Sequence, residues 1–372
     1  MVERNFADGP DQTGGAQAAG SQAKELSARE REILKDIILM YILSAEPVSS
    51  RSLAKQGRHG VSAATIRNIM ADLEELGYLR QPHTSAGRVP TGAGYHLFVE
   101  SLMGNRSVPA RVRRYIDENL REAPADGEGL ISITSHLLSE LSQQVGIVLT
   151  PAMGETVLRA IDFVPLSGSR VLVVVVAESG FVDNKVVDTD SPLPREDLIR
   201  VSNYLTENFG GRTLREIRDR LLAMMAEERA QVDQILGSTL EVAKRGLDQV
   251  AEREVLVDGT EVVLGHPELS DVIRVRRLIE TFTDKARLVQ MLNVCVQGEG
   301  VRVVIGEDSD LTSELDFSLV ATHYGVGRRH LGTLGIFGPS RMEYQRVIPL
   351  VHYLGQALSE VLAAASAGYE GD

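Results

Sequence analysis

The sequence predicts an α+β protein of several domains that begins with a winged helix-turn-helix. Its 372 residues exceed what one small hydrophobic core organises. Three short helical patterns between residues 27 and 76 are followed by a basic hairpin pattern punctuated by Gly and Pro. Valine-rich strand patterns alternate with helical patterns in the remainder of the chain.

The first two helices have clear start and stop signals. Ser27 with Glu30 predicts a capping box for a helix over 27–44 with an inward apolar stripe. Ser49 or Ser50 can cap a second, shorter helix that Gly57 ends. Both helices have the length expected in a small DNA-binding module.

The third helix has one apolar face and one small, polar face. Ser62 stands at the N-cap position, and Gly77 follows the last apolar residue. The inward stripe consists of Ile66, Ile69, Met70, Leu73 and Leu76. The opposite face carries Arg67 and Asn68 between small residues, as a helix that enters the major groove requires. Taken alone, the pattern favours an ordinary amphipathic helix.

The hairpin pattern runs from Tyr78 to Thr91. Arg80 and Arg88 stand on its two arms, and His83, Thr84 and Ser85 stand at its tip. Cations and hydroxyls on a tight loop are suited to phosphate or minor-groove contact. A plain surface turn has a similar composition, so the order of three helices and a hairpin is what favours a wing.

Charge is distributed unevenly along the chain. Residues 24–114 carry 14 Lys or Arg and 9 Asp or Glu, a net of +5, within a chain whose net charge is −13. The remainder therefore carries −18. A basic N-terminal part on an acidic body predicts that one part alone binds a polyanion.

The rest of the chain predicts two strand-rich regions around a largely helical block. The expected strands cover residues 145–150, 160–164, 170–177, 181–187, 288–295, 301–305, 317–324 and 331–337. We expect these strands to form one α/β domain, interrupted by the helical block, and a helix over 341–364 to close the chain. Residues 98–120 are expected to form a connecting helix, and Asp258-Gly259 predicts a hairpin turn. The helical block could contact a second subunit or pack on its own domain.

Signatures of catalysis and of metal binding are absent from the sequence. We find no phosphate-binding glycine loop, no nucleophile elbow and no His spacing for a metal, and Cys295 is the single cysteine. The expectation is a protein that is not an enzyme and uses no cofactor or metal. No apolar run approaches the length needed to cross a bilayer and no signal peptide is evident, so we expect no membrane contact and a cytoplasmic protein.

Two long stretches resemble one family. SAATIRNIMADLEELGYLRQPHTSAGRVPT, residues 62–91, and LGTLGIFGPSRMEYQRVIPLV, residues 331–351, are similar to signatures of HrcA, the bacterial heat-inducible transcription repressors. The resemblance implies a winged helix, a GAF-like α/β domain and a dimerising domain inserted within it. The implied limits are a disordered tail at 1–23, the winged helix at 24–104, the GAF-like domain at 105–195 and 285–372, and the dimerising domain at 196–284.

The resemblance also implies partners. These are double-stranded DNA with an inverted-repeat operator that controls chaperone operons, a second copy of the chain, and a GroEL-type chaperonin that modulates activity. From the winged-helix pattern we expect DNA contacts from Arg51, Lys55, Ser62, Thr65, Arg67, Asn68, Arg80, His83, Thr84, Ser85 and Arg88. The alternative is a ligand-sensing or protein-interaction module whose winged helix binds protein instead of DNA. Such a module would show no steeply salt-dependent binding to duplex DNA.

Overall fold

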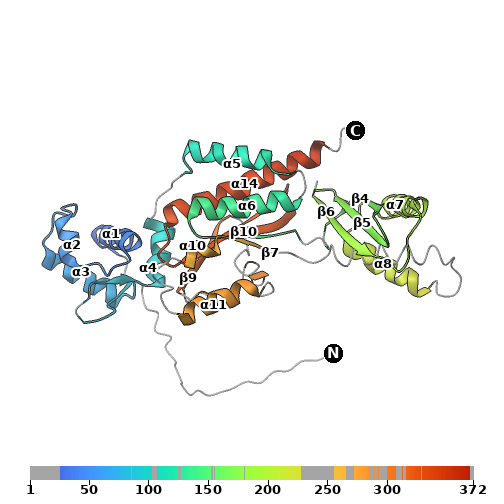
Figure 1. The fold of residues 1–372 in the computed structure, drawn as a ribbon. Helices are drawn as coiled ribbons and strands as arrows, with labels where there is room; N and C mark the ends of the chain where they lie inside the picture. Colours follow the sequence, from blue (N-terminus) through green and yellow to red (C-terminus); the bar gives the residue numbers. More distant parts are fainter. Residues whose placement is uncertain are drawn as a thin grey trace, which may run out of the picture.

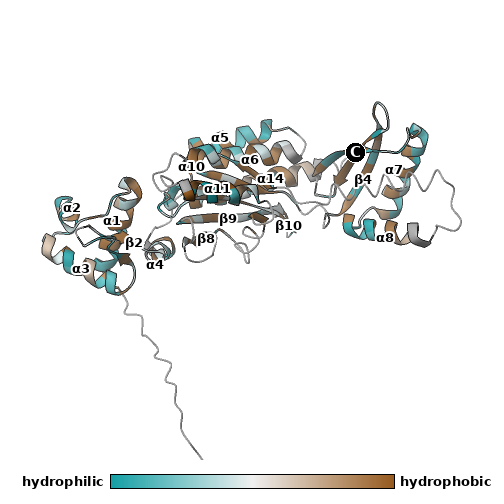
Figure 2. Ribbon diagram, turned by 60° about the horizontal axis from the view of Figure 1, so that its bottom comes forward, coloured by the Kyte–Doolittle hydropathy of each residue, from teal (hydrophilic) through white to brown (hydrophobic). Residues whose placement is uncertain are grey.

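The protein consists of three bodies arranged in a row, which two views show (Figure 1, Figure 2). The computed structural model describes residues 26–84, 86–102, 107–124, 127–151, 154, 156–179, 181–227, 255–264, 272–284, 288–289, 292, 300–306, 312, 316–327 and 329–368. Helices and strands are both abundant in these residues, which confirms the predicted α+β class.

The N-terminal body contains three helices and a two-stranded hairpin. Its elements are α1 (Ala28–Ser44), α2 (Ser50–Lys55), α3 (Ala63–Glu75), β1 (Leu79–Arg80) and β2 (Val89–Pro90), followed by α4 (Gly92–Leu97) and the π-helix η1 (Phe98–Leu102). The predicted capping box of α1 is present: the Ser27 hydroxyl accepts from the Glu30 amide at 3.2 Å, and the Ser27 amide donates to the Glu30 carboxylate at 2.7 Å.

The hairpin lies against the turn between α1 and α2. Val48 and Arg88 exchange backbone hydrogen bonds of 2.9 and 2.8 Å. Gly87 makes this approach possible, since a Cβ there would lie 2.3 Å from the Val48 carbonyl oxygen. The position of the wing therefore depends on a backbone contact that only glycine allows.

The central body is a five-stranded antiparallel sheet with helices on both faces. Its elements are α5 (Ala110–Glu122), α6 (Gly127–Ser142), β3 (Val145–Leu149), β7 (Val255–Asp258), α10 (Thr260–Leu264), α11 (Val272–Thr283), β8 (Arg302–Ile305), β9 (Phe317–Val326), β10 (Arg329–Pro339) and α14 (Tyr344–Gly368). The strand order is β7-β3-β10-β9-β8.

Successive side chains along the central strands point to opposite faces of the sheet, and apolar residues on both faces are covered by helices. Val148 and Ile336 belong to the core shared with α6 and α14, whereas Ile147 and Phe337 belong to a second core with α11. On that second face, the ring of Phe337 meets that of Phe282 from α11 at a centroid distance of 5.5 Å. A sheet buried on both sides shows the apolar runs that predicted these strands.

The third body is a separate three-stranded sheet covered by two helices. Its elements are β4 (Leu158–Pro165), β5 (Arg170–Ala177), β6 (Val182–Asp188), α7 (Arg195–Phe209) and α8 (Leu214–Glu227). A capping box starts α8: the Glu216 amide donates to the Thr213 hydroxyl at 3.2 Å, and the Thr213 amide donates to the Glu216 carboxylate at 3.0 Å.

This topology adds a feature that the sequence did not predict. The strands over 158–188, which were expected to share one α/β domain with the later strands, pair only with one another among the described residues. Strand patterns specify a local conformation and leave the partner strand open. The limits at residues 195 and 284 stay a prediction about domains, and residues 228–254 of the expected helical block lie outside the described residues.

Three local expectations are wrong. The strand expected over 288–295 is helical at its described residues Leu288, Val289 and Leu292. Asp258-Gly259 does not turn a hairpin: Gly259, at φ +81°, joins β7 to α10, and its carbonyl accepts from the Val262 amide. The helix expected over 98–120 is two elements, because Pro109 disfavours helical backbone in the residue before it and becomes the N-cap of α5.

One helix meets the length and composition of a membrane span, contrary to the expectation that no run does. It covers Tyr344–Ala365, and 44% of its most apolar window is buried inside the protein. Because it lies against β9 between α5 and α6 (Figure 1), its apolar side chains have a place in the central core. A core helix of a soluble protein has the same properties, so this finding is weak evidence for a membrane.

Gly87→Ala should destabilise the N-terminal body by about 1–3 kcal/mol, because the added Cβ overlaps backbone that cannot move aside. Thermal unfolding followed by circular dichroism measures this loss. Gly92→Ala is the matched control, since its Cβ would meet nothing closer than 3.9 Å. Equal melting temperatures for the two variants would show that the wing does not depend on the Val48 contact.

Candidate nucleic-acid interface

Helix α3 is held by one buried face. The Ser62 hydroxyl accepts from the Thr65 amide at 3.2 Å and caps the helix as predicted. Ile66 and Leu73 are fully buried and Met70 nearly so, while Ile69 and Leu76 pack at the edge of the core. The opposing surface is supplied by α1 and by Leu53 of α2. Burial of this stripe fixes which residues of α3 face outward.

The outward face of α3 presents Arg67 and Asn68. Both residues are exposed, as are the neighbouring Ala64 and Thr65. Within the described part of the chain, no hydrogen bond or ion pair engages the side chains of Arg67 and Asn68. An Arg fork matches the acceptors of guanine and an Asn amide matches adenine, and the small Ala64 permits close approach of the helix. The face therefore has the chemistry of base recognition.

Ser62 and Thr65 stand at the start of the same helix. Their hydroxyl oxygens lie 3.0 Å apart, and both side chains are exposed. Ser62 is occupied as the helix cap, so its contact to a DNA backbone stays a prediction, as does that of Thr65. Backbone amides at this helix start add a positive dipole end suited to phosphate.

Two further predicted cations lie on α2. Arg51 and Lys55 are exposed and four residues apart, so they share one face of this short helix. Ser49 and Ser52 form the capping box of α2, with the Ser52 amide 3.1 Å from the Ser49 hydroxyl. Helix α2 packs against α3, which brings the exposed cations of both helices to one end of the protein (Figure 1).

The tip of the wing is organised by a residue that the sequence reasoning missed. The Gln81 side-chain amide donates to the carbonyls of Thr84 and Ala86, each at 3.0 Å. His83 and Thr84 are exposed beside it, and the predicted Ser85 lies outside the described residues. A glutamine next to Pro82 gives no signal in the sequence for this role, because its partners are backbone carbonyls across the loop.

Arg88 makes an ion pair that the sequence did not predict. Its guanidinium lies 2.8 Å from the Glu74 carboxylate of α3, and the two side chains are 19% and 33% exposed. Because the charge of Arg88 is neutralised and mostly covered, this residue joins the wing to α3 and is poorly placed to bind phosphate. Glu74 was not expected to take part, since nothing in the spacing of residues 74 and 88 indicates an ion pair.

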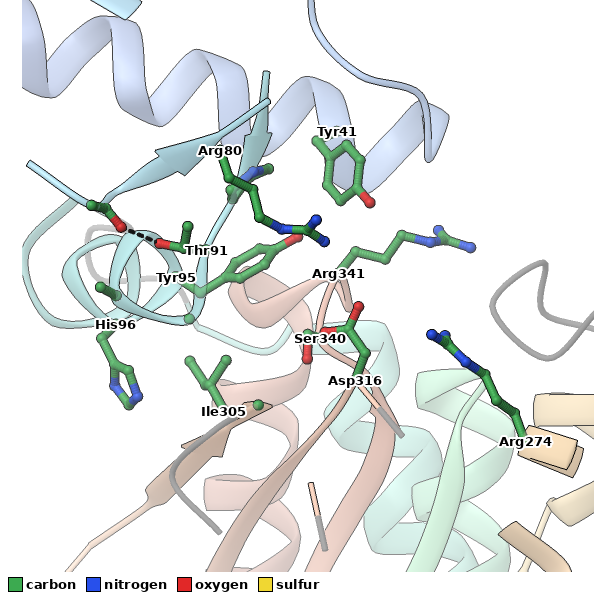
Figure 3. A pocket seen from close by; sticks show the side chains of 15 residues that line it. Tyr41, Arg80, Thr91, Tyr95, His96, Arg274, Ile305, Asp316, Ser340 and Arg341 are labelled. Carbon is green, nitrogen blue, oxygen red and sulfur yellow. Dashed lines mark hydrogen bonds between the residues drawn. The ribbon is translucent and has the colours of Figure 1, made fainter. Parts of the chain in front are cut away.

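Arg80 is exposed, but it lines a cavity between the N-terminal and central bodies (Figure 3). The structure thus does not bring all the predicted residues onto one surface. Arg51 and Lys55 lie on α2, Arg67 and Asn68 on α3, His83 and Thr84 on the wing tip, and Arg80 at the base of the wing.

A double-mutant cycle on Glu74→Gln and Arg88→Gln tests the ion pair. We expect a coupling of about 1 kcal/mol in chemical denaturation, at the upper end for surface pairs because both side chains are largely covered. Each single variant should destabilise the wing. Zero coupling would remove the structural role assigned to Arg88 and leave its predicted DNA contact as the better explanation.

Comparison with known proteins identifies relatives along most of the chain. Residues 128–348 match the family model of the HrcA protein C terminal domain. The heat-inducible transcription repressor HrcA of Geobacter sulfurreducens is 40% identical over 340 residues, covering 91% of this chain and 98% of the relative. The protein of the same name from Syntrophobacter fumaroxidans is 36% identical with the same coverage.

A solved structure shares the fold. It is described as the crystal structure of a hypothetical protein at 2.2 Å resolution, and it aligns with a TM-score of 0.66 at 24% identity. The alignment covers 92% of this chain and all of that one.

Proposed function

Because the chain belongs to the HrcA family of heat-inducible transcription repressors, we propose that it represses transcription by placing α3 in the major groove of an inverted-repeat operator. The observation that carries this proposal is the outward face of α3, where Arg67 and Asn68 are exposed and unpaired in the described structure. Family membership makes the protein a regulator of a class that is not enzymatic.

Base reading and backbone contact are divided among the elements. Arg67 and Asn68 read base edges, whereas Arg51 and Lys55 neutralise phosphates from α2. Ser62 and Thr65 contact the backbone at the start of α3. His83 and Thr84, with Ser85 at the same tip, act from the wing, and Arg88 holds the wing in place through Glu74. Arg80 is assigned to the cavity and not to DNA.

The operator is read by a homodimer, since an inverted repeat requires a two-fold protein. Exposed apolar side chains support the third body as the dimer surface. Six of the ten large exposed hydrophobic residues in the described structure lie on it: Val164, Leu166, Val186, Ile199, Tyr204 and Leu222. An excess of exposed apolar side chains on one body makes it the candidate for a protein–protein contact.

The relatives' name supplies the link to heat. We propose that the chain controls chaperonin and chaperone operons in the cytoplasm and that a GroEL-type chaperonin keeps it active. Heat fills the chaperonin with unfolded proteins, and a marginally stable repressor then loses its active population by mass action. Support for this part comes from the family alone.

Arg67→Ala should weaken binding to operator DNA by about 5- to 150-fold, the loss of one bidentate base contact, while non-specific binding changes little. Fluorescence anisotropy with operator and scrambled duplexes measures both affinities. Lys55→Ala is the matched control: it should weaken both similarly and reduce the slope of log K against log salt by about 1. An unchanged ratio of the two affinities in Arg67→Ala would exclude base reading by this residue.

A further inference from the structure

A cavity of about 790 Å³ lies where the N-terminal body meets the central body (Figure 3). One wall comes from α1, the base of the wing and α4. The other comes from the end of β8, from α11 and from the turn between β10 and α14. Cavities of 300–1,000 Å³ at domain junctions are the usual sites of small-molecule binding.

The cavity is positively charged. Arg80, Arg274 and Arg341 line it from three separate segments, and Asp316 is the one carboxylate among the described lining residues. Counted over those described residues alone, with His96 neutral, three cations stand against one anion, within a chain that is strongly acidic overall. Arginines that approach from several directions match the oxygens of a phosphate group better than a single carboxylate.

Tyr95 adds a buried donor. Its side chain is 3% exposed, and its hydroxyl has no hydrogen-bond partner among the described residues. Burial, followed by the nearby Tyr344, raises the pKa of this phenol well above its ordinary value, so it keeps its proton. In Figure 3 the Tyr95 ring extends from α4 into the space where Arg80 and Arg341 also project. Buried hydroxyls are nearly always paired, so an orphan donor in a cavity indicates a missing acceptor.

We propose that this cavity binds a small molecule carrying a multiply charged phosphate group, held by Arg80, Arg274 and Arg341 and by the Tyr95 hydroxyl. Its volume leaves room for more than the phosphate alone. The Asp316 carboxylate would accept a hydrogen bond from the uncharged part of such a molecule, and the Ser340 hydroxyl could donate one to it or accept one from it.

Because the cavity lies between two bodies, binding of a ligand there would have a structural consequence. Arg80 belongs to β1 of the wing, whereas Arg274 and Arg341 belong to the central body. The two bodies already meet here: the Arg341 guanidinium donates to the Ile42 carbonyl at 3.3 Å, and the rings of Tyr95 and Tyr344 lie 5.8 Å apart. A bound phosphate would add ties across this joint and restrict the orientation of α3. That consequence for DNA rests on the proposed function, whereas binding itself does not.

Isothermal titration calorimetry of the full chain with sodium pyrophosphate tests the proposal without DNA. We expect saturable binding of one pyrophosphate per chain, weakened about tenfold or more in Arg274→Gln through the loss of one charge-assisted contact. Arg277→Gln, which removes the same charge from an exposed residue of α11 outside the cavity, should bind like the wild type. Tyr95→Phe should bind several-fold more weakly and melt no lower, because it removes an unpaired hydroxyl.

Arg67→Gln separates this site from the DNA-binding face, and it should keep the wild-type affinity for pyrophosphate. Absence of saturable heat, or equal affinity in Arg274→Gln and Arg277→Gln, would overturn the proposal. Loss of binding in Arg67→Gln with retention in Arg274→Gln would overturn it too, by placing the anion on α3. Binding that follows the predicted pattern in a chain that fails to recognise an operator would contradict the proposed function and leave the cavity assignment standing.

Discussion

Burial of a single stripe on α3 is the constraint on which the surface that we propose to read DNA depends. Ile66 and Leu73 are completely covered, and each contributes about 1.5–3 kcal/mol by leaving water. With that stripe against α1 and α2, the helical period leaves Arg67 and Asn68 on the opposite side. The core of three short helices thus determines both the stability of the body and the residues presented to a groove.

A second set of contacts holds the wing in position. Backbone bonds between Val48 and Arg88 require Gly87, and the Arg88 side chain pairs with Glu74. A loop of Gly and Pro would otherwise sample many conformations, at an entropic cost on binding. Because the wing is held against both α3 and the turn before α2, its exposed tip is positioned before any partner binds.

Local signals in the sequence predicted the helices of the N-terminal body and most of the strands, although the stretch expected as a strand over 288–295 is helical at its described residues. The caps at Ser27 and Ser62 use residues three positions apart, so they are visible without a fold. Contacts between residues that are far apart in the sequence could not be predicted from it. The strands over 158–188 form their own sheet, and Arg88 meets Glu74 fourteen residues away.

The cavity between the N-terminal and central bodies could not be predicted from the sequence either. Its arginines stand at residues 80, 274 and 341, so no spacing in the sequence brings them together. Arg80 looked like one more cation of the wing because a hairpin arm has two sides, and the sequence does not say which side faces the central body. Composition and periodicity therefore predicted the helix that exposes Arg67 and Asn68, while the arginine-lined joint behind it required the three-dimensional structure.

Quantitative gel-shift titration with three duplexes tests most directly whether two copies of α3 read one operator. The duplexes carry the inverted repeat, one half-site alone and a scrambled sequence of equal length. We expect the inverted repeat to bind at least about 1,000-fold more tightly than the scrambled duplex, the half-site to fall between them, and affinity to drop steeply with salt. Equal affinity for all three duplexes would contradict sequence reading by a dimer.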